Sequence, residues 1–290
     1  MRVLMIGATG RYAGHVLPEL LKRGIMVRAL VRTRAAEHEA RKRGADETVM
    51  GNLEDPRGLI SAAVGADGVF HIGPAFHPRE AEMGVTMVDA AKAAGVRRFV
   101  FSSVIHPSIS RLANHAAKRP VEEALYESGM TFTVLQPGSF MQNVESDWDR
   151  VLDTGVFALP YSQRVKVCYV DYRDVAEAAA MAFIGDRLDN GTFELCAPGL
   201  LSRIQVAGLM SEALGRRIEA ARVDFEEWAD RAGLPQGPRR AGMQRLFADY
   251  DQFGFHGGNG LILRSILGRE PRSLRLYFRE LAGRVRKAAA

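Results

Sequence analysis

The sequence predicts an α/β protein, built as a doubly wound parallel Rossmann sheet with a smaller, mostly α C-terminal substrate domain. Short apolar runs alternate with helical stretches through the first half of the 290 residues, which is the order of a parallel sheet whose crossovers are helices. Most of these runs lack polar alternation, as is typical of strands buried on both faces. A glycine also follows each predicted helix of this half, where a left-handed helix cap favours glycine.

The elements of the first half follow in a regular order. The strands are expected at residues 3–6, 27–31, 47–50, 68–72, 99–102 and 131–135. The intervening helices are expected at residues 13–23, 35–43, 57–64, 79–94 and 112–128, and the glycines that end them are Gly24, Gly44, Gly65, Gly95 and Gly129. Five such stops in series predict the doubly wound topology.

The alternation fails after residue 138, and the second half is predicted as follows. A helix is expected at 144–153, a strand at 165–170, a helix at 173–184 and a strand at 192–196 that returns to the sheet, with mostly helical chain after Pro198. We therefore expect a nucleotide-binding Rossmann domain over residues 1–143, to which about 165–197 returns. Residues 144–164 and 198–290 would form a substrate or cap domain.

Composition limits the class of protein. Hydrophobic residues make up 47% of the chain and charged residues 25%, as in ordinary globular proteins. No window approaches the ~18 apolar residues that a membrane span needs, and no cleavable leader is apparent. An unprocessed cytoplasmic protein is expected. Cys168 and Cys196 lack the spacing of metal ligands or of a disulfide framework, so we expect buried thiols, with a reactive cysteine as the alternative.

The net charge of +5 is concentrated at the C-terminus. Eight basic residues against two acidic ones lie between Arg264 and Ala290, which leaves the rest of the chain nearly neutral. Apolar side chains of the same segment fall on one helical face, namely Leu274, Tyr277, Phe278, Leu281 and Val285. This pattern favours a docked helix with a solvated basic face over a nucleic-acid-binding segment.

A glycine-rich segment follows the first predicted strand directly and opens the first predicted helix. Gly7 permits a tight turn, Gly10 lets the backbone approach a pyrophosphate, and small Ala13 lets the helix pack close to the strand. This context predicts a dinucleotide-binding turn, with a purely structural glycine turn as the alternative. The cofactor-binding residues expected here are Gly7, Ala8, Thr9, Gly10, Arg11, Tyr12 and Ala13.

The end of the second strand indicates which dinucleotide is preferred. An acidic residue there bonds the ribose hydroxyl of NAD, whereas arginine accepts the 2′-phosphate of NADP. This chain has Arg32 and no acidic residue, with Arg11 and Arg34 close enough in sequence to add positive field. NADP(H) is therefore favoured over NAD(H), and the alternative is that Arg32 only extends along the surface. Asn52 and Leu53, after the third strand, are expected at the adenine edge.

Several motifs in order resemble the NmrA-like group of atypical short-chain dehydrogenases/reductases. They are GATG at 7–10 with Arg32, Ser102 and Ser103, Lys118, QPGSFMQN at 136–143, YVDYRDVA at 169–176 and FELCAP at 193–198. The resemblance covers roughly the first 215 residues well. It implies a Rossmann domain with a small C-terminal substrate domain, usual use of NADP(H), and one of two functions. Some members reduce quinones, azo dyes or triphenylmethane dyes, while others bind the nucleotide without catalysis and report redox state to a regulatory protein.

The resemblance also defines the candidate catalytic residues. Related dehydrogenases use a Tyr-x-x-x-Lys helix, but the residue four before Lys118 is Asn114. His115 is the expected replacement proton donor; alternatively, the acceptor takes its proton from water, or the protein is catalytically silent. Lys118 is expected to hold the nicotinamide ribose, and the alternative is a surface lysine paired with Glu122 four residues later.

Further residues are expected to line the same crevice. Ser102 and Ser103 end the fifth strand, where α/β sheets present ligand-contacting groups, although they could equally cap local backbone. Ser103 is assigned a catalytic role, and Gly73, Pro74, Pro137, Ser139 and Phe140 are expected to contact the cofactor. No metal and no flavin are expected. The leading hypothesis is an NADPH-dependent reductase of a small quinone-, azo- or enone-like acceptor. The alternative is an NADP(H)-binding redox sensor with a regulatory partner, and a homodimer is possible for either.

Overall fold

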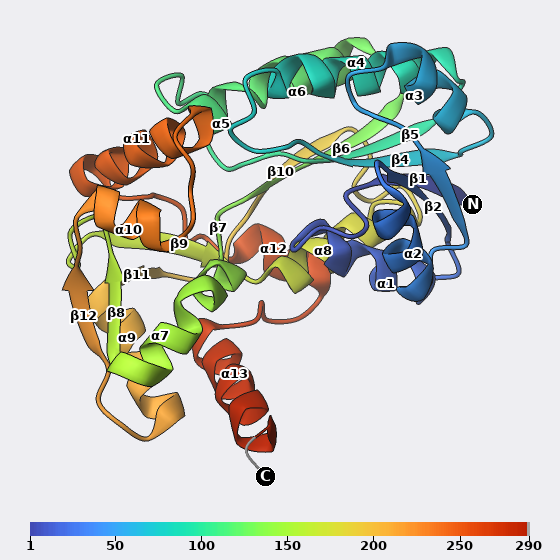
Figure 1. The fold of residues 1–290 in the computed structure, drawn as a ribbon. Helices are drawn as coiled ribbons and strands as arrows, with labels where there is room; N and C mark the ends of the chain where they lie inside the picture. Colours follow the sequence, from blue (N-terminus) through green and yellow to red (C-terminus); the bar gives the residue numbers. More distant parts are fainter. Residues whose placement is uncertain (289–290) are drawn as a thin grey trace. The chain divides into compact units, whose positions relative to one another are not determined.

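The computed structural model describes the backbone of residues 1–288 and the side chains of residues 1–285. The chain folds into two units (Figure 1). The first unit comprises Met1–Pro137 and Tyr172–Glu194, and the second comprises Gly138–Asp171 and Leu195–Ala290. The side chains of Arg286 and Lys287, which the sequence places in the basic tail, lie outside the described part of the chain.

A seven-stranded sheet forms the centre of the first unit. Its order is β10-β6-β5-β4-β1-β2-β3, and the strands are β1 (Arg2–Ile6), β2 (Met26–Val31), β3 (Glu47–Met50), β4 (Gly68–Ile72), β5 (Arg98–Ser102), β6 (Thr131–Pro137) and β10 (Gly191–Leu195). Strands β1 to β6 pair in parallel. The sheet reverses its winding between β1 and β4, and α/β sheets bind ligands at such a switch point.

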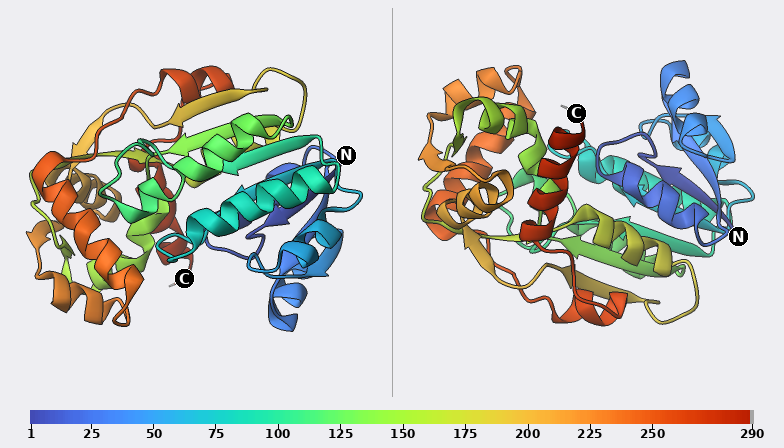
Figure 2. Two further views of the ribbon diagram at one scale, coloured as in Figure 1. Left: turned by 90° about the horizontal axis from the view of Figure 1, so that it is seen from above. Right: turned by 90° about the horizontal axis from the view of Figure 1, so that it is seen from below.

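Helices cover both faces of this sheet (Figure 2). On one face α3 (Pro56–Ala63), α4 (Glu80–Ala93) and α6 (Arg119–Glu127) pack side by side. On the other face α1 (Val16–Leu21) packs against α8 (Tyr172–Met181). The remaining helices of the unit are η1 (Ala13–His15), α2 (Arg34–Lys42) and α5 (Ala113–Ala116).

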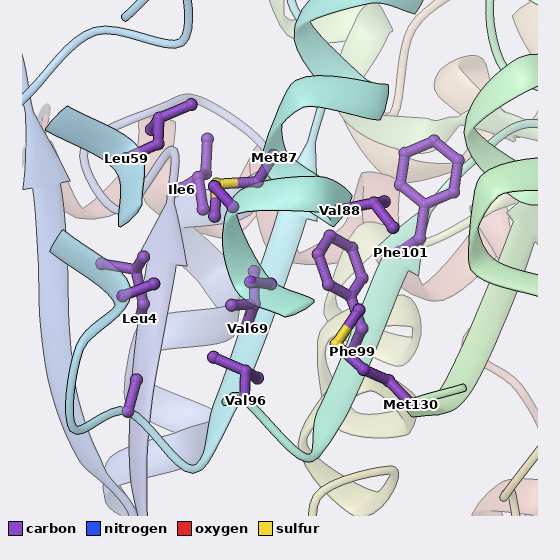
Figure 3. Packing of buried hydrophobic residues seen from close by; sticks show 14 of the residues in the cluster. Leu4, Ile6, Leu59, Val69, Met87, Val88, Val96, Phe99, Phe101 and Met130 are labelled. Atoms are coloured by element: carbon purple, nitrogen blue, oxygen red, sulfur yellow. The ribbon is translucent and has the colours of Figure 1, made fainter. Parts of the chain in front are cut away.

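A hydrophobic core lies between the sheet and the first of these helical layers (Figure 3). Leu4, Val69 and Phe99 from the strands pack with Leu59 of α3 and Met87 of α4. Successive strand residues point to opposite faces, so the neighbours of these strand residues are buried against the other layer. Burial on both faces is why the strands are apolar without alternation.

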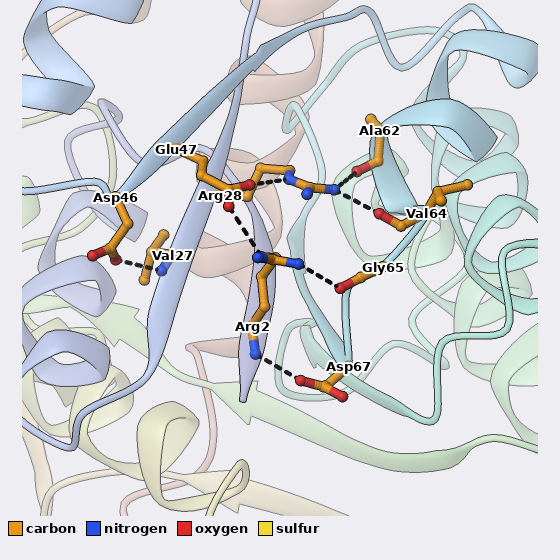
Figure 4. A network of polar contacts seen from close by, with 9 residues as sticks. All are labelled: Arg2, Val27, Arg28, Asp46, Glu47, Ala62, Val64, Gly65 and Asp67. Carbon is orange, nitrogen blue, oxygen red and sulfur yellow. Dashed lines mark hydrogen bonds and ion pairs between the residues drawn. The ribbon is translucent and has the colours of Figure 1, made fainter.

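A polar network ties the strands together where they begin (Figure 4). The Glu47 carboxylate forms ion pairs with two arginines, with Arg28 Nε at 2.7 Å and Arg2 Nε at 3.2 Å. The Arg28 guanidinium also donates to the carbonyls of Ala62 and Val64 at the end of α3. Charged side chains therefore hold β1, β2, β3 and α3 together at this edge, which leaves the opposite, carboxyl edge to carry function.

The predicted fold class is confirmed, and the elements of the first half lie within a few residues of their expected positions. All five glycines that were expected to end helices have positive φ angles. One helix differs, because the predicted helix at 112–128 is divided into α5 and α6 at Ala117 and Lys118. Pro120 explains the break, since proline favours the first turn of a helix over its interior.

The second unit contains helices and two small sheets. Its helices are η2 (Met141–Asp147), α7 (Trp148–Thr154), α9 (Arg203–Leu214), α10 (Phe225–Arg231), α11 (Pro238–Phe253), α12 (Leu261–Leu267) and α13 (Leu274–Ala288). Its strands are β7 (Ser139–Phe140), β8 (Val156–Leu159), β9 (Lys166–Val170), β11 (Leu200–Ser202) and β12 (Glu219–Arg222). The sheet orders are β11-β9-β7 and β12-β8.

The division into units differs from the expected domain boundaries at three places. Residues 138–143, 165–171 and 195–197 lie in the second unit, although the sequence assigned them to the Rossmann domain. The reason is strand pairing: β9 forms at its expected position but bonds to β11 and β7 and not to the large sheet. Only β10 returns to the large sheet.

The C-terminal helix α13 docks within the second unit through its apolar face, as the sequence predicts. Leu274, Tyr277, Phe278 and Leu281 are buried, while Arg275 is exposed. The Phe278 ring stacks on Trp148 with centroids 6.0 Å apart. Among the described residues, no helix is long and apolar enough to cross a membrane.

Candidate active site

The turn after β1 has the backbone that a dinucleotide site requires. Gly7 has a φ of +84°, and its carbonyl accepts a hydrogen bond from the Gly10 N–H at 2.8 Å. A Cβ at Gly10 would lie 3.1 Å from that carbonyl oxygen, and a Cβ at Gly7 would lie 3.1 Å from the Ala13 Cβ. The turn is thus tight because of its glycines, and its residues fit a pyrophosphate at the switch point.

Arg32 lies at the carboxyl end of β2 with an exposed side chain. Its neighbours are engaged: Thr33 caps α2 by accepting from the Ala36 N–H at 3.1 Å, and Arg34 pairs with Glu37 at 2.6 Å. No ion pair of Arg32 is recorded among the described residues. Of the two arginines at this strand end, Arg32 is therefore the one available to bind an anion.

The other residues expected around the adenosine lie in the same unit. Arg11 is exposed, with its guanidinium carbon 5.6 Å from the Tyr12 ring centroid. Asn52 shapes the turn after β3, because its backbone carbonyl accepts a hydrogen bond from the Asp55 N–H at 3.0 Å. Leu53 is half-buried and packs on the hydrophobic core between the sheet and α3, α4 and α6.

Ser102 and Ser103 are both buried at the end of β5, but they face different partners. The Ser102 hydroxyl lies 3.1 Å from the Tyr172 hydroxyl of α8. The Ser103 hydroxyl donates to Glu122 Oε1 of α6 at 2.5 Å. Neighbouring residues of a strand point to opposite faces of the sheet, so one serine is turned toward each helical layer.

Glu122 is a buried carboxylate that the sequence presented only as a partner for Lys118. In the structure its oxygens accept hydrogen bonds from Gln136 Nε2 at 2.9 and 3.1 Å, in addition to the bond from Ser103. The alternative interpretation, in which Lys118 and Glu122 form a surface pair, is therefore wrong. Because the Ser103 proton is directed to Glu122, the Ser103 oxygen can meet a further group only as an acceptor.

Lys118 is buried and pairs with a residue distant in sequence. Its ammonium lies 2.5 Å from Glu80 Oε1, at the first residue of α4, and 5.8 Å from the centroid of Phe101. The side chain is 6% exposed, so Lys118 is not the ordinary surface lysine of the alternative interpretation. It lies at the carboxyl edge of the sheet, beside Gly73.

His115 is also buried, in α5. Its Nδ1 lies 3.1 Å from the His106 carbonyl oxygen. A carbonyl only accepts, so Nδ1 carries the proton and Nε2 of the neutral ring does not. His115 could therefore donate a proton to a substrate only as the imidazolium, and its catalytic role stays a prediction.

His71 of β4 is a buried group near Lys118 that no sequence pattern marks as functional. Burial, and to a lesser extent the charge of Lys118, lower the pKa of His71 from 6.5 to about 3. Its ring stacks on Phe101 with centroids 5.6 Å apart. The ring is therefore neutral at physiological pH, and neither of its nitrogens has a partner among the described residues.

The remaining expected contacts divide between the two units. Gly73, Pro74 and Pro137 belong to the first unit, at the ends of β4 and β6. Ser139 and Phe140 form β7 of the second unit, where they pair with Tyr169 and Val170. The residues of the first unit thus form one candidate site at its carboxyl edge.

The two cysteines come together in the second unit despite their separation in sequence. Both are buried, and no disulfide joins them. A hydrogen bond with Cys196, and then burial, raise the pKa of Cys168, which disfavours the reactive thiolate. The expectation of buried thiols is confirmed. In the described part of the chain, no group of three or more His, Cys, Asp or Glu residues could hold a metal ion.

The sheet order, the glycine turn and the polar residues at the carboxyl edge define a protein of the dinucleotide-binding Rossmann class. The NmrA-like family model matches residues 1–276, and the chain belongs to that family. It is 32% identical to an NAD(P)H azoreductase of Xenophilus azovorans, over 85% of this chain and 86% of that protein.

Two solved structures share the fold. An NADPH-dependent quinone oxidoreductase of Escherichia coli, complexed with NADPH, matches with a TM-score of 0.81 and 22% identity, over 96% of this chain and 99% of that chain. Nmra, a negative transcriptional regulator, matches with a TM-score of 0.76 and 18% identity, over 99% of this chain and 97% of that chain. Members of this fold thus include both an enzyme and a regulator.

Proposed function

We propose that this protein is an NADPH-dependent reductase of a small quinone-, azo- or enone-like acceptor. The observation that carries the proposal is the carboxyl edge of the large sheet in the first unit. The glycine turn, the exposed Arg32 and the buried Lys118 all lie at this edge. The likeness to an azoreductase along most of the chain supports the choice of acceptor.

The residues divide into those that bind and those that orient. The 7–13 turn receives the pyrophosphate, Arg32 binds the 2′-phosphate, and Asn52 and Leu53 lie toward the adenine. NADPH supplies a hydride when bound. Lys118 holds the nicotinamide ribose, and Ser103, fixed as an acceptor by Glu122, orients the reacting groups. Gly73, Pro74, Pro137, Ser139 and Phe140 are proposed as further cofactor contacts.

The source of the proton follows from the acceptor. Quinones and azo compounds become basic at oxygen or nitrogen after receiving a hydride, and water can then protonate them. No tyrosine is needed for such acceptors, which agrees with Asn114 at the position four before Lys118. We propose direct transfer from nicotinamide to acceptor without a flavin or a metal, and action in the cytoplasm.

The test is NADPH oxidation by the purified protein with menadione, an azo dye and an enone in turn. Loss of NADPH absorbance above the protein-free rate with at least one acceptor is expected. Tight NADPH binding together with no turnover of any acceptor would refute the reductase and favour the second function.

That second function is an NADP(H)-binding redox sensor. It is favoured by the missing tyrosine and by the fold shared with a transcriptional regulator. A sensor must bind NADP⁺ and NADPH with different affinities, because ligands bound equally cannot shift an equilibrium. Calorimetric titration with both forms tests this, together with self-association and regulatory-partner binding in each form. Equal affinities would exclude the sensor.

A further inference from the structure

A buried carboxylate at the first residue of α4 has no role in the function proposed so far. Glu80 is 2% exposed. Its Oε1 accepts from the Lys118 ammonium at 2.5 Å, and its Oε2 accepts from the Phe76 N–H at 3.0 Å. Phe76 has a φ of +66°, so the second bond holds a residue in the left-handed region. Glu80 therefore joins Lys118 to the segment that follows β4.

The ion pair lies directly against the backbone of Gly73. A Cβ at Gly73 would be 3.0 Å from Glu80 Oε1 and 3.3 Å from Lys118 Nζ. A larger residue at this position would push the pair away from the end of β4. The absence of a side chain thus brings the ammonium to the carboxyl edge, where α/β sheets bind their ligands.

Stability alone does not account for this pair. Removing both charges from water is costly, and a protein with apolar residues of similar size in place of a buried ion pair is often equally stable. An ammonium has three N–H donors. One is directed to Glu80, and the ammonium makes no other hydrogen bond to the described residues 1–285. Two donors are therefore left for hydroxyl groups of a ligand.

We propose that Glu80 is a positioning residue that holds the Lys118 ammonium at the Gly73 edge, so that its other two donors meet the nicotinamide ribose. This inference rests on the proposed function in that it requires NADPH to bind. It predicts that Glu80 does not touch the cofactor and affects cofactor binding only through Lys118.

A double-mutant cycle on NADPH affinity tests the proposal. Glu80→Gln removes the charge but keeps an oxygen for the Phe76 N–H, and Lys118→Met removes the ammonium but keeps the length. Each single substitution is expected to raise the calorimetric Kd for NADPH about tenfold, as for the loss of one charged hydrogen bond. The double variant is expected to match Lys118→Met, because the effects of a coupled pair are not additive.

The control is Glu82→Gln on the same helix, whose exposed side chain pairs with Arg79, and its Kd should equal that of the wild type. Circular dichroism verifies the fold of every variant. If Glu80→Gln does not fold, Glu80→Asp replaces it, and it should give an intermediate Kd because it keeps the charge with a shorter reach.

Three outcomes overturn the inference. These are an unchanged Kd in Glu80→Gln or its substitute, a roughly hundredfold loss in the double variant that marks independent effects, and a wild type that binds no NADPH. Only the last of these also refutes the proposed reductase. Conversely, a wild type that binds NADPH but reduces no acceptor refutes the reductase while the cycle still tests Glu80.

Discussion

At the scale of single residues, Arg32 is the side chain on which cofactor preference depends. Replacing Arg32 with alanine should weaken the binding of NADPH by about 1.5–3 kcal/mol, because a charged hydrogen-bonding partner of the 2′-phosphate is lost. NADH, which lacks that phosphate, should bind as before. Calorimetry with both nucleotides measures the difference.

Arg34→Ala is the matched control, since Arg34 is already paired with Glu37. It should change neither affinity by more than a few tenths of a kcal/mol. Equal weakening of NADPH and NADH by Arg32→Ala would mean that Arg32 does not bind the phosphate.

His71 gives a pH dependence of stability. Its pKa is about 3 in the folded protein against an ordinary value of 6.5, so below pH 6.5 the unfolded chain binds a proton that the folded chain does not. The contribution of neutral His71 to the free energy of unfolding is therefore complete above pH 6.5. It is lost as the pH falls toward 3, at up to about 1.4 kcal/mol per pH unit. Urea unfolding at several pH values measures the slope.

His71→Phe keeps a ring against Phe101 and removes the titration. Its free energy of unfolding should therefore fall less steeply with acidification than that of the wild type. His38→Gln, on the exposed side of α2, should retain the wild-type slope. Parallel slopes for His71→Phe and the wild type would contradict the assignment.

At the scale of elements, Gly138 is required because the chain passes close to the two thiols of the second unit. A Cβ there would lie 2.9 Å from Cys168 Sγ and 3.1 Å from Cys196 Sγ. Gly138→Ala should therefore lower the free energy of unfolding by about 1–3 kcal/mol through overpacking. Denaturant titration measures the loss, and adding Cys168→Ala should recover part of it by making space.

The control is Gly208→Ala in α9 of the same unit, where a Cβ would meet nothing within 4 Å. Alanine is the better helix former, so this substitution should stabilise by about 0.5–1 kcal/mol. If both substitutions destabilise alike, the thiols are not the cause.

The elements differ in how far the sequence predicts them. In the first half the strands are mostly apolar runs of four to seven residues, and a glycine follows each expected helix, so the local patterns are sufficient to predict them. Strands β7, β8, β11 and β12 have only two to four residues, which is too short for periodicity to appear. The division between α5 and α6 could have been predicted from Pro120, but the helical periodicity on both sides concealed it.

For the whole molecule, the proposed function predicts stabilisation by the cofactor. A ligand at a hundred times its Kd that binds only the folded chain adds about 2.7 kcal/mol to the free energy of unfolding. NADPH should therefore raise the thermal midpoint, and NADH at the same concentration should raise it less. Scanning calorimetry measures both, and Arg32→Ala should bring the two shifts together. A midpoint unaffected by NADPH would contradict nucleotide binding.

The sequence by itself determined the fold class, the glycine turn and Arg32 as the candidate phosphate ligand, because each depends on residues close together in the chain. Only the tertiary structure decided which groups meet across the fold. Glu80 lies 38 residues from Lys118, Glu122 lies 19 residues from Ser103, and Cys168 and Cys196 meet although neither is near a diagnostic spacing. Such pairs are formed by strand order and helix packing, so no local pattern records them. The same cause places β9 in the small sheet with β11 and β7 and not in the large sheet, since the choice of strand partners depends on contacts that the local sequence does not encode.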